Sequence, residues 1–119
     1  MVDSLPLLPI SQEHLQALVA VLLVYQRYRR EKTPPTAERT RTLIILEFLI
    51  PKLYSGVGTH EEATPLWLTV DDVQIIKAGL ATLLDNLNRK PPSARIKQEM
   101  QRLKELKTVI EQTFRTTQD

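Results

Sequence analysis

The side chains that can perform acid–base or metal chemistry are few in this chain. It contains 2 histidines and no cysteine in 119 residues. The run His60-Glu61-Glu62 sets a histidine beside two carboxylates, but it lacks the two histidines one helical turn apart that zinc hydrolases use. Asp71 and Asp72 form a second acidic pair, which fits a helix start better than a pair of catalytic acids. We therefore expect no metal site.

The other groups that support catalysis have structural explanations. A nucleophile needs a base within hydrogen-bond reach and a third group that orients this base. Ser11 and Ser93 are placed to cap helices, Ser55 to end one, and His14 falls in the first turn of a predicted helix. Gly56-Val57-Gly58 lacks the third glycine and the preceding strand of a phosphate-binding loop. We expect no catalytic residue, no cofactor and no enzymatic activity.

Aromatic and basic side chains alternate around residue 28. Tyr25 and Tyr28 stand among arginines at positions 27, 29 and 30, an arrangement that suits phosphate contacts and base stacking. The helices predicted on either side are long and matched, whereas a helix-turn-helix protein joins shorter helices at a steep angle. A nucleic-acid-associated function that uses the basic end near the two Pro-Pro turns, at residues 34–35 and 91–92, is therefore the alternative and not the leading prediction.

Four further basic residues are harder to attribute to helix stability. Cations in the last turn of a helix complement the negative end of its dipole, so Arg89 and Lys90 need no further role. The first turn of a helix favours acids instead, yet four cations fall near predicted helix starts. They are our candidate contacts to an anion or a partner: Arg39, Arg41, Arg95 and Lys97.

The elements that would position these side chains are separated by a pattern that occurs twice. Lys32-Thr33-Pro34-Pro35-Thr36-Ala37-Glu38-Arg39 and Lys90-Pro91-Pro92-Ser93-Ala94-Arg95 share a base, a Pro-Pro pair, a hydroxyl residue, an alanine and an arginine. Proline ends a helix and disfavours helical geometry in the residue before it, while Thr or Ser caps the helix that follows. Each copy therefore predicts the turn of a helical hairpin.

Local signals set the predicted boundaries. Thr69 with Asp72 three residues later predicts a capping box. Pro51 lies inside a helical pattern that ends near Tyr54, so it predicts a kink or a restart. Gly79, beside Ala78 and Ala81, predicts close contact between helices. Residues 1–119 should form a single domain with an extended arm at 1–10, hairpins at 11–55 and 69–115, a long connection at 56–68 and a tail at 116–119.

The fold class that follows is all-α. Four helices of similar length in two hairpins predict an antiparallel four-helix bundle with an extended N-terminal arm. If the long connection continues the alternation, both Pro-Pro turns lie at one end. Residues 27–41 carry a balance of +4 and residues 89–97 another +4, in a chain of net charge +2. We therefore expect one basic end and one acidic end.

The first two helices are apolar on most faces, whereas the last two each carry a single apolar stripe. A helix that is apolar all round must be covered all round, and a small bundle leaves one face open. We therefore expect a second copy or a protein partner over the first hairpin. The candidate interface residues are Val21, Val24, Ile45, Phe48 and Leu49. The predicted function is a small non-enzymatic interaction, adaptor or assembly module that associates with itself.

Composition bears on the compartment. The chain has no cysteine, which suits a reducing environment. Its most apolar early stretch, Ala17 to Tyr25, is too short to span a bilayer and follows acidic rather than basic residues. The sequence favours a cytoplasmic protein with neither a signal peptide nor a membrane span.

Overall fold

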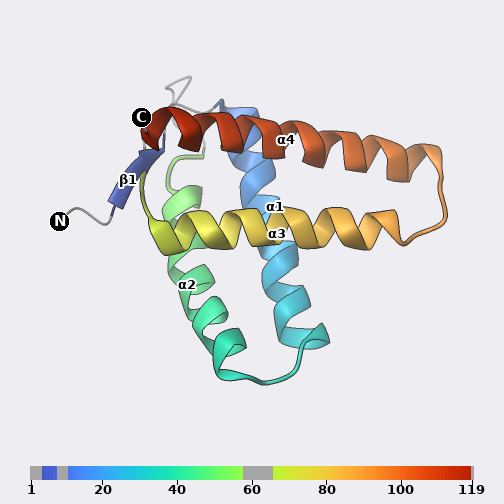
Figure 1. Ribbon diagram of the computed structural model, residues 1–119, viewed down its shortest axis with the longest axis horizontal. Helices are drawn as coiled ribbons and strands as arrows, with labels where there is room; N and C mark the ends of the chain where they lie inside the picture. The colour runs from blue at the N-terminus through green and yellow to red at the C-terminus, as the bar shows by residue number, and fades with distance from the viewer. Residues whose placement is uncertain (1–3, 8–10, 58–65, 119) are drawn as a thin grey trace.

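The chain folds into two helical hairpins that lie across one another (Figure 1). The computed structural model describes residues 4–7, 11–57 and 66–118. Within these ranges the helices are α1 (Gln12–Lys32), α2 (Ala37–Tyr54), α3 (Val70–Asn88) and α4 (Ala94–Gln118), and the short strands are β1 (Ser4–Leu7) and β2 (Leu66–Thr69). The predicted helical class and the predicted hairpin turns are confirmed.

Hydroxyl side chains start the helices as predicted. Ser11, Thr36 and Ser93 each accept a hydrogen bond from the backbone N–H three residues later, at 3.2, 3.1 and 3.2 Å. Thr69 and Asp72 form the full capping box, with both reciprocal bonds 3.0 Å long. These contacts satisfy N–H groups that the first turn of a helix leaves without partners, so the local sequence fixes where each helix begins.

The helix ends follow the sequence less closely. α2 continues through Pro51 without the restart that the sequence allowed, and it ends at Tyr54, as predicted. α4 runs to Gln118, beyond the expected end at 115, because no glycine or proline lies at residues 115–118 to stop it. Most of the predicted connection at 56–68, including His60-Glu61-Glu62, lies outside the described residues.

The N-terminal arm is extended over Ser4–Leu7, as predicted, but it also pairs with a second segment. β1 and β2 form an antiparallel pair in which Ser4 lies opposite Thr69 and Leu7 opposite Leu66. Pro6 is tolerated here because a two-stranded sheet consists of edge strands only. The pairing was not predicted, since it joins short segments that are far apart in the sequence.

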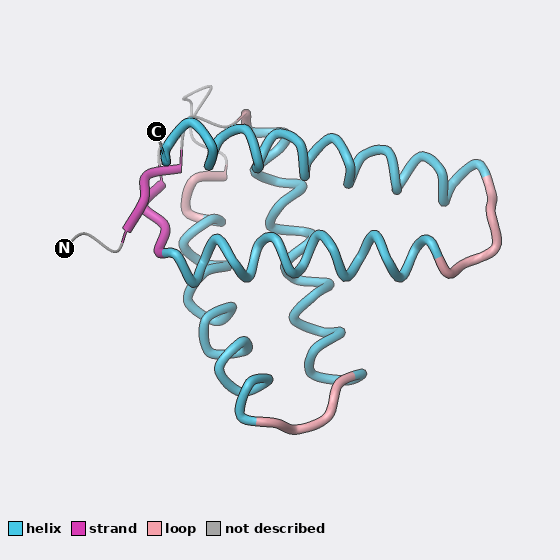
Figure 2. Tube along the Cα trace, in the orientation of Figure 1, coloured by secondary structure: helices cyan, strands magenta, loops and turns pink. Residues whose placement is uncertain are grey.

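The two hairpins do not align into the predicted antiparallel bundle. Each hairpin is antiparallel within itself, but α3 crosses both α1 and α2, and α4 lies beside α3 (Figure 2). The α1–α2 turn and the α3–α4 turn therefore lie at separate corners of the molecule (Figure 1). The prediction of a single basic end that contains both turns is wrong.

Two contacts explain the crossing. A Cβ atom at Gly79 of α3 would lie 3.2 Å from Cδ2 of Tyr25 and 3.4 Å from Cδ2 of Leu22, so the missing side chain lets α3 lie close against α1. Asp72, buried at the start of α3, pairs with the ammonium of Lys52 near the end of α2 at 3.0 Å. The first half of α3 is therefore held against both helices of the first hairpin.

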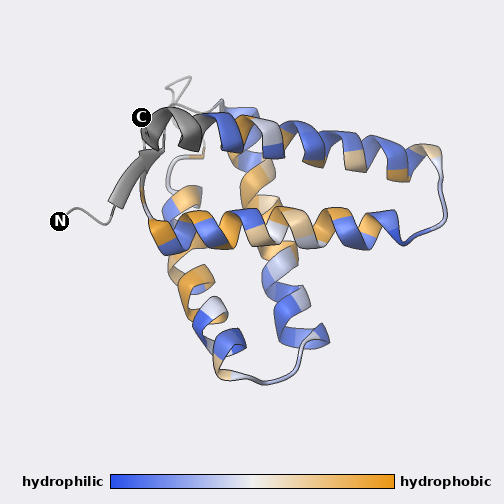
Figure 3. Cartoon of the chain, in the orientation of Figure 1, coloured by the Kyte–Doolittle hydropathy of each residue, from blue (hydrophilic) through white to orange (hydrophobic). Residues whose placement is uncertain are grey.

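The hydrophobic core lies where the hairpins cross. All four helices contribute fully or nearly fully buried side chains to one cluster, among them Leu18 and Leu22, Leu46 and Leu49, Ile76 and Leu80, and Leu106 and Ile110. Hydrophilic residues gather toward the turn of each hairpin (Figure 3). Burial of apolar surface is the main stabilising contribution, and this burial is concentrated at the crossing, while the turn ends extend away from it.

Candidate interaction groove

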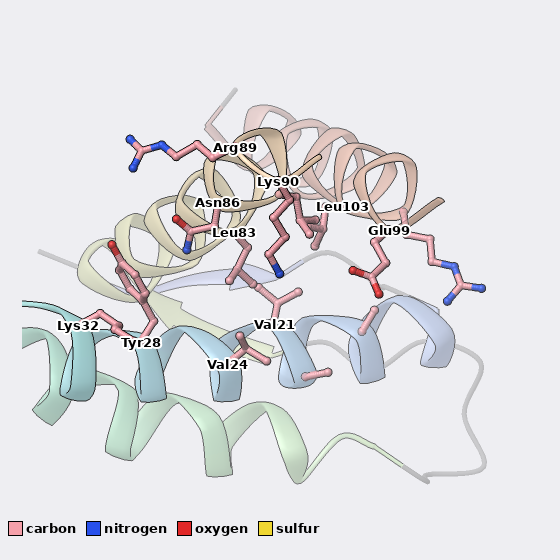
Figure 4. Close-up of a pocket in the computed structure, with 14 residues that line it drawn as sticks. Val21, Val24, Tyr28, Lys32, Leu83, Asn86, Arg89, Lys90, Glu99 and Leu103 are labelled. Carbon is pink, nitrogen blue, oxygen red and sulfur yellow. The ribbon is translucent and has the colours of Figure 1, made fainter. Parts of the chain in front are cut away.

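A groove of about 870 Å³ lies between α1 and the turn end of the α3–α4 hairpin, where α3 ends and α4 begins (Figure 4). It exists because α3 crosses α1 near Gly79 and then continues past the first hairpin to Asn88. Beyond the crossing, α3 extends away from α2, and side chains of α3 and α4 line an open space beside α1. The groove is thus a direct consequence of the crossed arrangement.

The floor of the groove is apolar and joins the core. Val21 and Leu87 are almost fully buried, with 7% and 9% of their surface exposed. Leu83 and Leu103 are half-buried and pack against the core cluster from α3 and α4. Val24 is 53% exposed at the centre of the α1 side. A ligand in the groove would therefore cover apolar surface that the fold itself leaves in water.

The α1 side of the groove is a long straight stripe. Its lining residues follow helical spacing and are Ala17, Ala20, Val21, Val24, Tyr28 and Lys32. At the rise of an α-helix, the distance from Ala17 to Lys32 is about 23 Å, or roughly four turns. Ala17 and Ala20 are exposed and small, so they leave room for close approach at one end. This length matches a helical segment better than a compact small molecule.

The edges of the groove carry an excess of positive charge. Within the described residues, no ion pair involves Lys32, Lys90 or Arg102. The side chain of Lys90 extends from the end of α3 toward Val21 (Figure 4). Glu99 is the acidic residue in the lining, and its Oε1 forms an ion pair with Nε of Arg95 at 3.5 Å. The groove therefore combines an apolar floor with three cations that have no ion-pair partner in the described part of the chain.

Arg89 also lines the groove but contributes less to it. Its guanidinium pairs with Asp85 at 3.0 Å, and in Figure 4 it points away from the groove. The two Pro-Pro turns nevertheless contribute to one surface, because Lys32 precedes the first and Lys90 precedes the second. Cations from both turns, Lys32 and Lys90, therefore line the same groove, although the turns do not lie at one end of a bundle.

The four cations predicted to contact an anion are divided between the hairpins. Arg39 is half-buried on α2, and its Nη1 donates to the carbonyl oxygens of Arg30 at 3.3 Å and Thr33 at 3.1 Å. Arg41 pairs with Asp71 at 3.2 Å. Arg95 and Lys97 are exposed on α4, at the other corner of the molecule. The structure does not bring the four together, and Arg39 already has a structural role.

The five residues predicted for an oligomer interface fall into three environments. Val21 and Leu49 belong to the core, and Ile45 is half-buried. Val24 and Phe48 are exposed, at 53% and 71%. Sequence reasoning did not identify the groove residues on α3 and α4, because the spacing of Leu83 and Leu103 is the same as that of core residues. The useful signal was the apolar character of α1 on most faces, since both Val21 and Val24 line the groove.

One pair of side chains resembles part of a catalytic arrangement. Ser11 Oγ and Nδ1 of His14 lie 2.9 Å apart, a distance that suits a nucleophile and its base. Ser11 Oγ also accepts the backbone N–H of His14 at 3.2 Å, which is the capping bond of α1. Among the described residues no carboxylate hydrogen-bonds to His14, so a group that would orient the base is missing there. The geometry fits a helix cap.

Other classes of site gain no support from the described part of the chain. It holds no cluster of three or more histidine, aspartate or glutamate side chains that could hold a metal ion. No helix within it is long and apolar enough to cross a membrane. Comparisons with protein-family models, with curated proteins and with solved structures found no match.

Proposed function

We propose that this chain is a non-enzymatic protein-interaction module, an adaptor or assembly factor, whose groove binds a helical segment of a partner protein. The observation that supports this most strongly is the open apolar floor along α1, which includes the half-exposed Val24. An amphipathic helix lying along α1 would cover this floor. It would also pack against the side chains of α3 and α4 that line the groove. Recognition of a helix in a groove is a recurring mode of protein binding.

The charges on the groove indicate what the partner helix carries. Lys32, Lys90 and Arg102 have no ion-pair partner within the described residues, and they flank the apolar floor. Acidic side chains beside an apolar stripe would meet these cations, which favours the correct orientation and rejects a basic helix. The expected partner segment is therefore apolar on one face and acidic along its edges.

Nucleic-acid binding, the alternative, has less support. Of the aromatic and basic residues that suggested it, Tyr25 is buried in the core. Arg29 forms an ion pair with Glu38. Arg27 forms an ion pair with Glu31. A surface that stacks on bases and contacts phosphates needs these groups to be free, so the cluster is better explained as part of the first hairpin.

The test uses two synthetic helix-stabilised peptides of about 16 residues, the length that spans the α1 stripe. Both carry the same leucine stripe; one has glutamates beside it and the other has lysines. Fluorescence anisotropy of the labelled peptides is measured against the full chain. The acidic peptide should bind, the basic one should bind at least about tenfold more weakly, and added salt should reduce the difference.

A pair of valines supplies the matched control. Val24→Asp places a charge on the groove floor and should weaken binding of the acidic peptide by about tenfold or more. Val70→Asp changes an equally exposed valine at the start of α3, outside the groove, and should leave binding unchanged. Equal binding by the two variants would contradict the proposal. Salt-sensitive binding of a single-stranded oligonucleotide, with neither peptide bound, would favour the nucleic-acid alternative instead.

A further inference from the structure

A second apolar surface lies on the first hairpin, on the side of α1 opposite the groove. We name it the outer face and define it by Leu23, Gln26 and Arg30 of α1 and Ile44, Glu47 and Phe48 of α2. Three of these residues are large apolar side chains in contact with water: Leu23 is 50%, Ile44 51% and Phe48 71% exposed. Helical spacing places Leu23, Gln26 and Arg30 on one side of α1, and Val21, Val24 and Tyr28 on the other.

The outer face has a shallow centre with charges at its two ends. A depression of about 300 Å³ is lined by Gln26, Arg30, Leu43, Ile44 and Glu47, together with Thr40. Arg30 lies at the end near the α1–α2 turn, since its carbonyl accepts a hydrogen bond from Arg39 in the first turn of α2. Glu47 lies two helical turns farther along α2 than Thr40, or about 10 Å toward the other end.

These charges are complementary under a two-fold rotation. Within the described residues, neither Arg30 nor Glu47 takes part in an ion pair. The axis passes through the centre of the depression, near Gln26 and Ile44. Rotation about it exchanges the Arg30 end of the depression with the Glu47 end. The arginine of each copy then faces the glutamate of the other, while the three exposed apolar residues of the outer face become covered. Self-complementarity of this kind is what an isologous dimer requires.

The geometry points to a second copy of this chain as the partner of the outer face. The dimer forms through α1 and α2 of both copies, with reciprocal pairs between Arg30 and Glu47. Of the interface residues that the sequence suggested, Phe48 lies on this surface, while Val21 and Leu49 are internal. Because the groove lies on the opposite side of α1, both grooves of the dimer remain open. The dimer therefore presents two binding sites to a partner.

The test is a charge exchange followed by sedimentation equilibrium. The wild-type chain should reach twice its mass of 13.7 kDa as its concentration rises. Arg30→Glu and Glu47→Arg should each weaken self-association by about tenfold or more, because like charges then face each other twice. An equimolar mixture of the two single variants should restore the dimer, since each copy supplies the charge that the other lacks. Lys97→Glu, a charge reversal on α4, should change nothing.

The absence of native cysteine allows a second measurement that needs no charge variant. Gln26→Cys places one thiol near the proposed axis, where two copies can form a disulfide on mild oxidation. Gln101→Cys, on the exposed side of α4, is the control and should cross-link much more slowly. A wild-type chain that stays monomeric at every concentration would overturn the proposal, as would a mixture that does not restore the dimer or equal cross-linking of the two cysteine variants.

The two proposals can fail separately. A monomeric Arg30→Glu variant should still bind the acidic peptide with the affinity of a single groove, because Arg30 is not among the groove residues. Loss of the dimer without loss of peptide binding therefore tests the outer face alone. Loss of peptide binding in a chain that still dimerises tests the groove alone.

Discussion

Arg39 is a cation in the first turn of a helix, where acidic residues are favoured, and its contacts give this position a structural explanation. A cation in the first turn of α2 is unfavourable for the dipole of that helix. Its guanidinium, however, donates to the carbonyl oxygens of Arg30 and Thr33, which lie at the C-terminal end of α1. The charge therefore complements the negative end of the neighbouring helix and ties the two helices together at their turn.

A pair of arginine substitutions tests this explanation. Arg39→Ala should lower the free energy of unfolding by about 1–2 kcal/mol, because it leaves two carbonyl groups without their charged donor. Arg41→Ala removes an exposed ion pair to Asp71 and should cost less than about 0.5 kcal/mol. Urea denaturation of the two variants gives the comparison. Equal effects would show that the carbonyl contacts of Arg39 add nothing to stability.

The buried phenol of Tyr25 should make the free energy of unfolding depend on pH in the alkaline range. Burial raises the pKa of its phenol above 10.0, its ordinary value; Glu38 and Tyr28 add to this rise and Arg29 opposes it. Above pH 10 the unfolded chain loses this proton while the folded chain still holds it, so the folded state binds more protons and stability falls as pH rises.

Tyr25→Phe isolates this effect, because it keeps the ring in the core and removes the titrating group. The free energy of unfolding, measured by urea denaturation from pH 8 to about 11, should fall less steeply for the variant than for the wild-type chain. Parallel curves would contradict the assignment of the effect to Tyr25. The two proteins differ only at this hydroxyl group, so the difference between their curves reports on Tyr25.

At the scale of the element, the sequence predicted most of what depends on nearby residues. Helix starts depend on a hydroxyl group and an N–H three positions later, so Thr36, Thr69 and Ser93 were identified correctly. The hairpin turns follow from Pro-Pro pairs in the same way. The β1–β2 pair was missed because the whole first hairpin separates its two strands in the sequence.

The contact between α1 and α3 depends on Gly79, and it can be tested there. Gly79→Val would push a branched side chain against Tyr25 and Leu22 and should lower the free energy of unfolding by about 1–3 kcal/mol. Ala81→Val, at an exposed position on the same helix, introduces the same side chain and should cost less than about 1 kcal/mol. Thermal unfolding of both variants checks the difference. Similar losses would show that the close approach is unimportant.

At the scale of the whole molecule, the crossing of the hairpins was beyond what the sequence could predict. Two hairpins joined by a long connection can align or cross, and their internal patterns are the same in either case. The choice depends on contacts between the hairpins, such as Gly79 with Tyr25 and Lys52 with Asp72. Crossing also creates the groove, so its residues could not be separated from core residues in advance. The apolar surface of α1 was the part of the site that the sequence did indicate.

The groove as a binding site for an acidic amphipathic helix is tested most directly by NMR titration of the ¹⁵N-labelled full chain with the acidic peptide. The largest amide shifts should fall on the groove stripe of α1 and on Leu83, Lys90 and Leu103. Residues of the outer face, such as Ile44 and Phe48, should change little. Shifts concentrated on the outer face, or none at saturating peptide, would show that the groove does not bind this helix.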